Sequence, residues 1–216
     1  MKDRPTSRPD RTLAGTPSEP LYRPREDSLL LVPFARVARG TSLLEVGAGT
    51  GLAAIEGARG GARVVATDLN PYALHHLRDR AREAGLSVDV VRTDLARGLG
   101  RFDRIVANPP YLPTRPGEQD PDPWHNLALD GGPDGCRVVA RLVASLPDHL
   151  TAGGAAFVVT SSVQSASGLA AIREGWARSG GESSVVAGRS LEGERLEVWR
   201  LARRGERVRA QRERSA

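Results

Sequence analysis

Short apolar runs alternate with longer amphipathic stretches from residue 21 to residue 201. The runs predict strands and the stretches, which repeat with the period of a helix, predict helices. Strand and helix alternate, which is typical of an α/β fold with a mostly parallel sheet. The last two strands are separated by a short turn, so we expect them to form an antiparallel pair. The predicted strands are 42–46, 63–67, 87–92, 103–107, 155–160, 183–187 and 195–201, and the predicted helices are 51–59, 70–84, 135–150 and 164–179.

The composition indicates one globular domain. The chain has 216 residues, of which 39% are hydrophobic, enough for a complete core. It has neither an apolar run of membrane-spanning length nor a signal-peptide pattern, so we expect a cytoplasmic protein without membrane contact. Because Cys136 is the one cysteine, an internal disulfide and a cysteine-based metal centre are excluded. We predict no metal site.

The positive charge is concentrated at the ends of the chain. The sequence pI is about 10.2, yet residues 21–202 contain 21 basic and 21 acidic side chains. Residues 203–216 hold six arginines and two glutamates. We therefore expect a disordered segment at 1–20, a domain at 21–202 and a basic disordered tail at 203–216. Such a tail can attract RNA through its phosphates, although a solvated tail is the simpler interpretation.

Asn108-Pro109-Pro110-Tyr111 follows the predicted strand 103–107 and is the most informative motif. Prolines donate no backbone hydrogen bond, so they stop the sheet and leave carbonyl oxygens at its carboxyl edge. The Asn108 side chain adds an acceptor beside the Pro109 carbonyl, and Tyr111 offers a flat face. Two adjacent acceptors suit a planar NH2 group with two hydrogens to donate. The motif therefore predicts a site for an exocyclic amine or a carboxamide.

A glycine-rich turn, with Gly47, Gly49 and Gly51, separates the first predicted strand from the first long helix. Glycines let the backbone approach a ligand at a helix amino end. The nicotinamide fingerprint requires a different spacing, and Glu45 stands two positions before the first glycine. A pyrophosphate would be repelled by Glu45, whereas a sulfonium cation with an amino group would not. The turn therefore favours S-adenosylmethionine over a dinucleotide.

Two more acids stand at the carboxyl ends of the next strands. Asp68 is placed to accept the paired hydroxyls of a ribose. Asp94 can accept the adenine amine while Leu95 covers the ring. Each acid alone is more often a turn or cap residue. Three acids at successive strand ends beside a glycine turn favour cofactor binding.

The segment 112–133 directly follows the Asn-Pro-Pro-Tyr motif and shows no evident secondary structure. A loop of about twenty residues in a compact domain is usually functional or disordered. We expect a lid that shapes the substrate site, with disorder of 117–123 as the alternative.

Together, residues 45–51, Asp68, Asp94 and 108–111 resemble the motifs of class I S-adenosylmethionine-dependent methyltransferases that act on planar nitrogen. Residues 21–28, LYRPREDS, are similar to the Y-x-P-x-E-D-[ST] motif of HemK-type release-factor glutamine methyltransferases. Residues 129–135, LDGGPDG, are similar to their A-x-G-G-x-x-G motif. The resemblance covers about residues 21–201 and does not include the helical amino-terminal domain of bacterial members. The sequence therefore resembles the single-domain branch of archaea and eukaryotes.

The resemblance implies a Rossmann-like fold with a mostly parallel seven-stranded sheet, an antiparallel last strand and helices on both faces. It implies that the cofactor contacts Ser28, Glu45, Gly47, Asp68, Asp94, Leu95 and Asn108. It places Asn108, Pro109 and Tyr111 at the target nitrogen, and we include Pro110 as part of the same motif. Members of this branch often pair with a small zinc-binding activator, for which the predicted edge strand 87–92 is a candidate contact.

Three positions depart from the family pattern. Pro33 interrupts the first helix of the family pattern, which precedes the predicted strand 42–46. Arg25 replaces a small residue, and Asp130 stands where an apolar residue is usual. We expect methylation of a protein glutamine. The first alternative is an RNA or DNA methyltransferase that acts on adenine N6 or guanine N2, because these amines fit the same motif. The second is a scaffold that binds the cofactor without catalysis.

Overall fold

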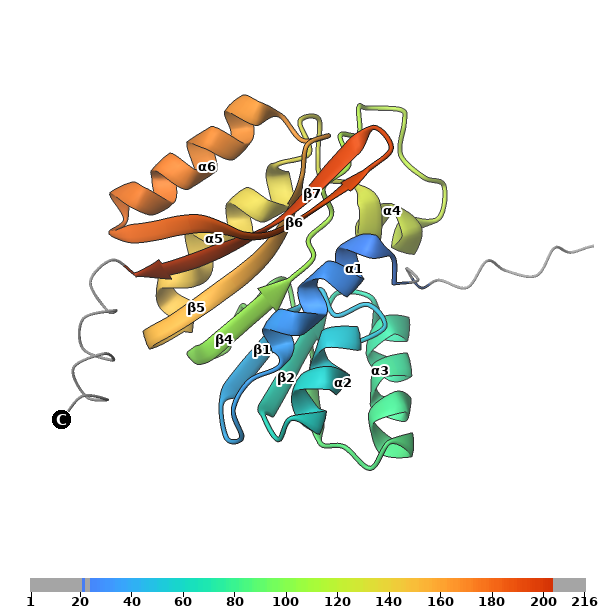
Figure 1. Ribbon diagram of the computed structural model, residues 1–216. Coiled ribbons are helices and arrows are strands. Elements are labelled where there is room, and N and C mark those ends of the chain that lie inside the picture. Colours follow the sequence, from blue (N-terminus) through green and yellow to red (C-terminus); the bar gives the residue numbers. More distant parts are fainter. Residues whose placement is uncertain (1–20, 22–23, 204–216) are drawn as a thin grey trace, which may run out of the picture.

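The computed structural model describes residue 21 and residues 24–203, and these contain a seven-stranded sheet (Figure 1). The predicted segment 1–20 lies outside the described residues, as does the predicted tail 203–216 except for Arg203, which ends the last strand. The strands are β1 Ser42–Val46, β2 Arg63–Asp68, β3 Val88–Arg92, β4 Phe102–Ala107, β5 Leu150–Ser161, β6 Gly181–Leu191 and β7 Glu194–Arg203.

The strand order is β3-β2-β1-β4-β5-β7-β6. Strands β1 to β5 run parallel to one another, and β7 runs antiparallel to both β5 and β6. The predicted sheet is thus confirmed, with β3 at one edge and β6 at the other. The order reverses between β1 and β4, and such a switch point opens a crevice at the carboxyl ends of the strands.

Helices cover both faces of the sheet, as the sequence predicts (Figure 1). Residues of α1, η1, α2 and α3 join one apolar cluster, and residues of α5 and α6 join a second. Pro33 lies in η1, directly after α1 ends at Leu31, so the predicted interruption of the first helix is confirmed. The helices are α1 Glu26–Leu31, η1 Val32–Ala35, α2 Leu52–Arg59, α3 Pro71–Glu83, α4 Pro123–Leu129, α5 Arg137–His149 and α6 Ala166–Arg178.

Consecutive strand residues enter opposite clusters, which is the period of two expected for a sheet buried on both faces. Leu43 and Val106 pack in the first cluster, while Leu44 and Ile105 pack in the second. All four are at most 1% exposed. The central strands β1 and β4 are therefore held from both sides, which fixes the ends from which the site is built.

Two local expectations are wrong. The fifth strand was expected at 155–160, but β5 already begins at Leu150, directly after α5 ends at His149, and it includes Gly153. The pairing with β4 shifts there, which accommodates extra residues in β5. The segment 112–133 contains α4 and is not a structureless loop. Asp122 caps α4 by accepting hydrogen bonds from the amides of Trp124 and His125, and Pro123 occupies the first turn.

No helix in the described part of the chain is both long enough and apolar enough to cross a membrane.

Candidate active site

The glycine-rich turn lies at the switch point and joins β1 to α2. Gly47 and Gly49 line a cavity above the carboxyl ends of the strands, whereas Gly51 is not among the lining residues. Gly51 has φ +71°, and a Cβ atom there would lie 2.1 Å from Leu77 Cδ1 of α3. The absence of a side chain at Gly51 therefore lets α2 and α3 pack closely.

Glu45 is a buried carboxyl group at the base of this turn. Its Oε2 accepts a hydrogen bond of 2.7 Å from the Ala54 amide in the first turn of α2, and it also lines the cavity. Burial raises the pKa of Glu45 to about 8, although the amides of Ala54 and Ala53 oppose the shift. The nearby Asp68 carboxylate adds to the shift. A cation in the cavity would favour the ionised form of Glu45.

Asp68 ends β2 and binds the glycine-rich turn. Its Oδ2 accepts from the Gly49 amide at 2.8 Å and its Oδ1 accepts from the Asn70 amide at 2.8 Å. Burial raises the pKa of Asp68, while the amides of Asn70 and Gly49 act in the opposite direction. Asp68 thus fixes the shape of the turn and also lines the cavity beside it.

Asp94 and Leu95 line the cavity just beyond β3. Asp94 Oδ2 forms an ion pair with Arg141 of α5. Leu95 has φ +54°, a left-handed conformation that is uncommon for leucine. Its carbonyl accepts a hydrogen bond of 2.8 Å from the Thr67 hydroxyl of β2. This bond holds the Leu95 backbone against the end of β2.

Asn108 stands at the end of β4 and lines the cavity. Its Nδ2 lies 3.5 Å from the Ser28 hydroxyl of α1. Its Oδ1 is buried and has no hydrogen-bond partner among the described residues. A buried acceptor without a partner is rare in proteins and costs about 1–3 kcal/mol. A ligand that donates an N–H to Oδ1 would recover this free energy.

Tyr111 is oriented by a buried acid that the sequence analysis did not single out. Its hydroxyl donates to Asp27 Oδ2 at 3.1 Å, and Asp27 is 3% exposed. Asp27 Oδ1 accepts from the Ser28 amide at 2.6 Å. The α1 segment thus contacts the Asn-Pro-Pro-Tyr motif at both Ser28 and Asp27. Pro109 and Pro110 line the cavity between these two contacts.

The glycine-rich segment before α5 supports the same motif from behind. Gly135 has φ +73°, and a Cβ atom there would lie 2.4 Å from the Tyr111 carbonyl oxygen. The buried Gln164 side chain donates to the Gly135 carbonyl at 2.7 Å and accepts from the Ser161 amide at 2.8 Å. This close approach explains why the A-x-G-G-x-x-G motif requires glycine at its last position.

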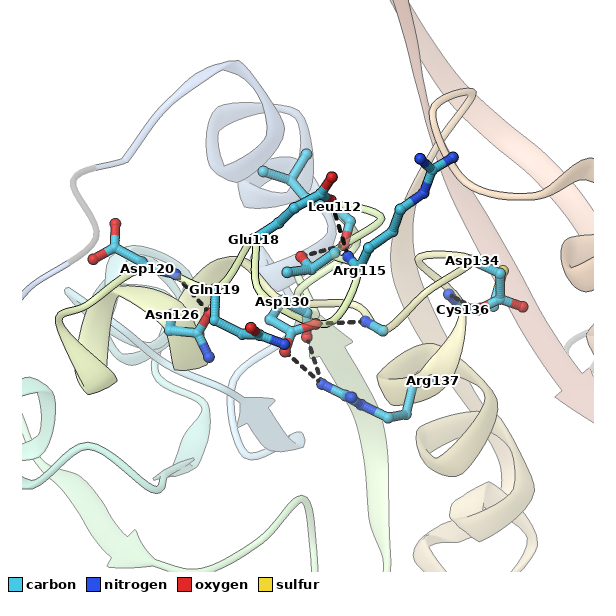
Figure 2. Close-up of polar contacts among 12 residues, drawn as sticks. Leu112, Arg115, Glu118, Gln119, Asp120, Asn126, Asp130, Asp134, Cys136 and Arg137 are labelled. Atoms are coloured by element: carbon cyan, nitrogen blue, oxygen red, sulfur yellow. Dashed lines mark hydrogen bonds and ion pairs between the residues drawn. The ribbon is translucent and has the colours of Figure 1, made fainter.

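The lid, residues 112–133, is closed at its base by backbone pairing. The Leu112 amide donates to the Leu129 carbonyl at 3.1 Å, and the Leu112 carbonyl accepts from the Gly131 amide at 2.9 Å. Asp130, one of the departures from the family pattern, accepts from the Gly132 amide and forms an ion pair of 3.0 Å with Arg137 (Figure 2). A charged residue at position 130 therefore joins the lid to α5.

The middle of the lid is held by polar contacts around α4 (Figure 2). The Asp120 amide donates to Asn126 Oδ1 at 3.1 Å, and Asp120 Oδ2 lies 2.5 Å from His125 Nδ1. Trp124 lines the cavity and meets the Tyr72 ring of α3 edge-on, with ring centroids 6.0 Å apart. The capping pair Asp122-Pro123 was the sequence signal that could have predicted α4, and with it Trp124.

The cavity encloses about 490 Å³, a volume typical of ligand sites. Every predicted site residue except Gly51 lines it, from the glycine-rich turn to the Asn-Pro-Pro-Tyr motif. Seven carboxyl groups and three arginines are among its lining residues, so the cavity is acidic although the domain as a whole is neutral. This charge favours a cationic ligand. Within the described residues no group of three or more histidine, cysteine or acidic side chains could hold a metal ion.

The methyltransferase small domain family matches residues 26–174 of this chain. A putative protein N5-glutamine methyltransferase of Methanocaldococcus jannaschii is 38% identical over 145 residues, which cover 66% of this chain and 73% of the relative. The methyltransferase HEMK2 of Mus musculus is 36% identical over 155 residues, covering 65% of this chain and 71% of the relative. A release factor glutamine methyltransferase of Deinococcus radiodurans is 42% identical over 141 residues, 62% of this chain but about half, 51%, of the relative.

Solved structures show the same fold. Mtq2 of E. cuniculi, in the Mtq2-Trm112 complex that methylates the translation termination factor eRF1, has a TM-score of 0.65, with 24% identity over 85% of this chain and 99% of that chain. The T. thermophilus 16S rRNA N2 G1207 methyltransferase, solved with AdoMet and guanosine, has a TM-score of 0.61, with 23% identity over 84% of this chain and 44% of that chain. The HemK-type resemblance is confirmed by the sequence relatives. The chain is a methyltransferase and belongs to the methyltransferase small domain family.

Proposed function

We propose that this protein transfers a methyl group from S-adenosylmethionine to the side-chain amide of a glutamine in another protein, such as the Gly-Gly-Gln segment of a translation release factor. One observation carries the proposal: the buried Asn108 Oδ1 without a partner among the described residues. A carboxamide NH2 placed between this oxygen and the Pro109 carbonyl would satisfy both acceptors. The names of the sequence relatives, which are glutamine methyltransferases, support this choice of acceptor.

The cavity residues fit the cofactor. Asp68 would accept the ribose hydroxyls, Asp94 the adenine amine, and Glu45 the amino group. Glu45 is buried and Asp68 is half-buried, and burial raises the pKa of both carboxyl groups. A cationic ligand would stabilise their ionised forms. When bound, S-adenosylmethionine supplies an electrophilic methyl group on a positively charged sulfur.

The protein's contribution to the reaction would be orientation and hydrogen bonding at the acceptor nitrogen. The lone pair of an amide nitrogen is delocalised into its carbonyl, so the nitrogen is a weak nucleophile. If Asn108 Oδ1 and the Pro109 carbonyl accept hydrogen bonds from its two N–H groups, they increase the electron density on the nitrogen and direct its lone pair at the methyl carbon. The new C–N bond forms as the C–S bond breaks, with its electrons going to sulfur. The surplus proton then leaves the nitrogen for water.

The acidic cavity favours a protein acceptor over the nucleic-acid alternative. Glu26, Asp27 and Glu194 line the cavity in addition to the three predicted cofactor acids. A neutral amide can approach such a wall, whereas a nucleotide brings phosphates that these carboxylates repel. Most of the net positive charge of the sequence comes from residues 203–216, which hold six arginines and two glutamates.

We further propose that the edge strand β3 binds a small zinc-binding activator subunit. In the described residues β3 pairs with β2 alone, so its other edge offers backbone groups to a partner strand. The solved Mtq2 complex contains a second protein, Trm112, which supports the idea of a subunit. Hydrogen exchange of the protein mixed with a candidate activator should slow at β3 and stay unchanged at β6, the opposite edge. Equal exchange at β3 with and without the activator would contradict the assignment.

The acceptor can be identified by label transfer. The protein and S-adenosylmethionine labelled at the methyl group are mixed separately with a release factor bearing Gly-Gly-Gln, with the same factor bearing Gly-Gly-Asn, and with ribosomal RNA. We expect label only in the first sample. Label in the RNA, lost when residues 204–216 are removed, would instead support the nucleic-acid methyltransferase.

Asn108→Ala tests the mechanism and the scaffold alternative together. We expect the variant to bind cofactor normally. Its turnover should slow, with an activation barrier about 1–3 kcal/mol higher, because one hydrogen-bond acceptor for the amide is missing. Asn126→Ala is a matched control, since Asn126 also lines the cavity but accepts its hydrogen bond from the lid. Near-normal turnover of Asn108→Ala would remove Asn108 from the mechanism. Tight cofactor binding without methylation of any acceptor by the unmodified protein would favour the scaffold.

A further inference from the structure

Helix α5 presents two arginines, one helical turn apart, to the wall of the cavity. Arg137 pairs with Asp130 of the lid, and Arg141 pairs with Asp94 beyond β3. The two arginine side chains are similarly exposed, 53% and 55%. They differ in their partners, because Asp130 belongs to the lid and Asp94 is the acid proposed for the adenine amine. The pair of arginines therefore offers a test residue and a control on the same helix.

The Arg141–Asp94 ion pair is too exposed to be explained by stability. The Asp94 side chain is 38% exposed, and ion pairs between exposed groups contribute little to folding. The pair nevertheless determines the orientation of Asp94. Arg141 occupies Asp94 Oδ2, whereas no described residue donates to Oδ1. One oxygen is thus held by the protein and the other is left for a ligand.

We propose that Arg141 is a positioning residue that makes the site selective for the 6-amino group of the cofactor's adenine. The inference rests on the proposed function, since it assumes that adenine lies beside Asp94. Arginine is always protonated and has no acceptor, so it can only donate to Asp94 and holds that side chain in one orientation. Leu95 and Leu142 supply apolar cavity wall next to this pair. A carboxylate fixed in this way accepts the amine without first losing its freedom of rotation.

The experiment compares two ligands by calorimetry. The first is S-adenosylhomocysteine, and the second is its analogue with hydrogen in place of the 6-amino group. The ratio of their dissociation constants measures how strongly the amine is recognised. In the unmodified protein we expect the analogue to bind about tenfold more weakly, the scale of one hydrogen bond to a charged group. Arg141→Met should reduce this ratio to about twofold to threefold, and Arg141→Lys should restore part of it.

Arg137→Met is the matched control and should leave the ratio near its original value. Asp94→Ala should make the two ligands bind equally, because it removes the proposed hydrogen-bond acceptor for the 6-amino group. An unchanged ratio in Arg141→Met, or in Asp94→Ala, would overturn the inference, as would an equal reduction in Arg137→Met. A purely structural role of Arg141 would weaken both ligands equally. If the unmodified protein binds neither ligand, the proposed cofactor fails; if binding is tight and only the ratios disagree, the proposed function stands without this inference.

Discussion

The buried Glu45 carboxyl provides a quantitative prediction. Its pKa rises from 4.5 to about 8 on folding, mainly because burial disfavours the charged form. A folded-state pKa above the unfolded value in an acid means that the unfolded state ionises first as the pH rises. Stability from this group is therefore complete below pH 4.5 and is lost progressively until the pH passes the folded-state pKa of about 8.

The perturbation is Glu45→Gln. Glutamine keeps an oxygen for the Ala54 amide, which Glu45 contacts at 2.7 Å, but it cannot ionise. With these two pKa values, proton linkage predicts that the unmodified protein loses about 3–4 kcal/mol of unfolding free energy from pH 5 to pH 8 at this residue alone. Glu45→Gln should not show that loss. Other titrating groups, including Asp68, affect both proteins and largely cancel in the comparison.

The assay is denaturant unfolding of both proteins at pH 5, 6.5 and 8, with the cofactor absent. The difference in stability should grow with pH in favour of Glu45→Gln.

A bound cation would favour the ionised form of the Glu45 carboxyl group. The unmodified protein should therefore release up to one proton on binding S-adenosylmethionine at pH 7, measured by calorimetry in buffers of different ionisation enthalpy. Its affinity should rise as the pH approaches 8. Parallel stability curves for the two proteins would refute the burial argument.

Three further substitutions test other parts of the site. Gly135→Ala should lower the free energy of unfolding by about 2 kcal/mol or more, measured by thermal or denaturant unfolding, and should displace the Tyr111 carbonyl. Gly153 has a similar φ but open space around it, so Gly153→Ala should lower the free energy of unfolding by about 1 kcal/mol. Equal losses in the two variants would contradict the crowding argument. Trp124→Phe should abolish the change in tryptophan fluorescence on cofactor binding, because the other two tryptophans are buried outside the cavity. A change that persists in this variant would contradict the assignment of Trp124 as the tryptophan that senses the cofactor. Asp68→Ala should weaken cofactor binding in calorimetry by at least tenfold, since it removes the proposed ribose contact and the hydrogen bond that holds the glycine-rich turn; unchanged affinity would contradict the ribose assignment.

The sequence predicted the sheet and most of the cavity wall because both depend on local patterns. Strand ends carry the glycine-rich turn, Asp68 and Asn108, and the topology brings parallel strand ends to one edge. Contacts between distant segments could not be predicted in the same way. The hydrogen bond from Tyr111 to Asp27 joins residues 84 positions apart, and no periodicity indicates it. The lid was mistaken for a loop because α4 has seven residues, too few for a helical pattern, although its cap was readable.

The charge of the cavity and the state of Asn108 together restrict the chemistry more than either does alone. The acidic groups that line the cavity favour a cationic methyl donor. Asn108 supplies a neutral hydrogen-bond acceptor, because its Oδ1 lacks a partner among the described residues. A negatively charged methyl acceptor would be repelled by the acidic cavity wall, and a positively charged nitrogen could not act as a nucleophile. A neutral NH2 group meets both conditions. Ser28 and Asp27 of α1 contact the Asn-Pro-Pro-Tyr motif, and Gly135 lies against the Tyr111 carbonyl. These contacts would fix the proposed acceptor oxygens before the substrate arrives, so little reorganisation would be required during transfer.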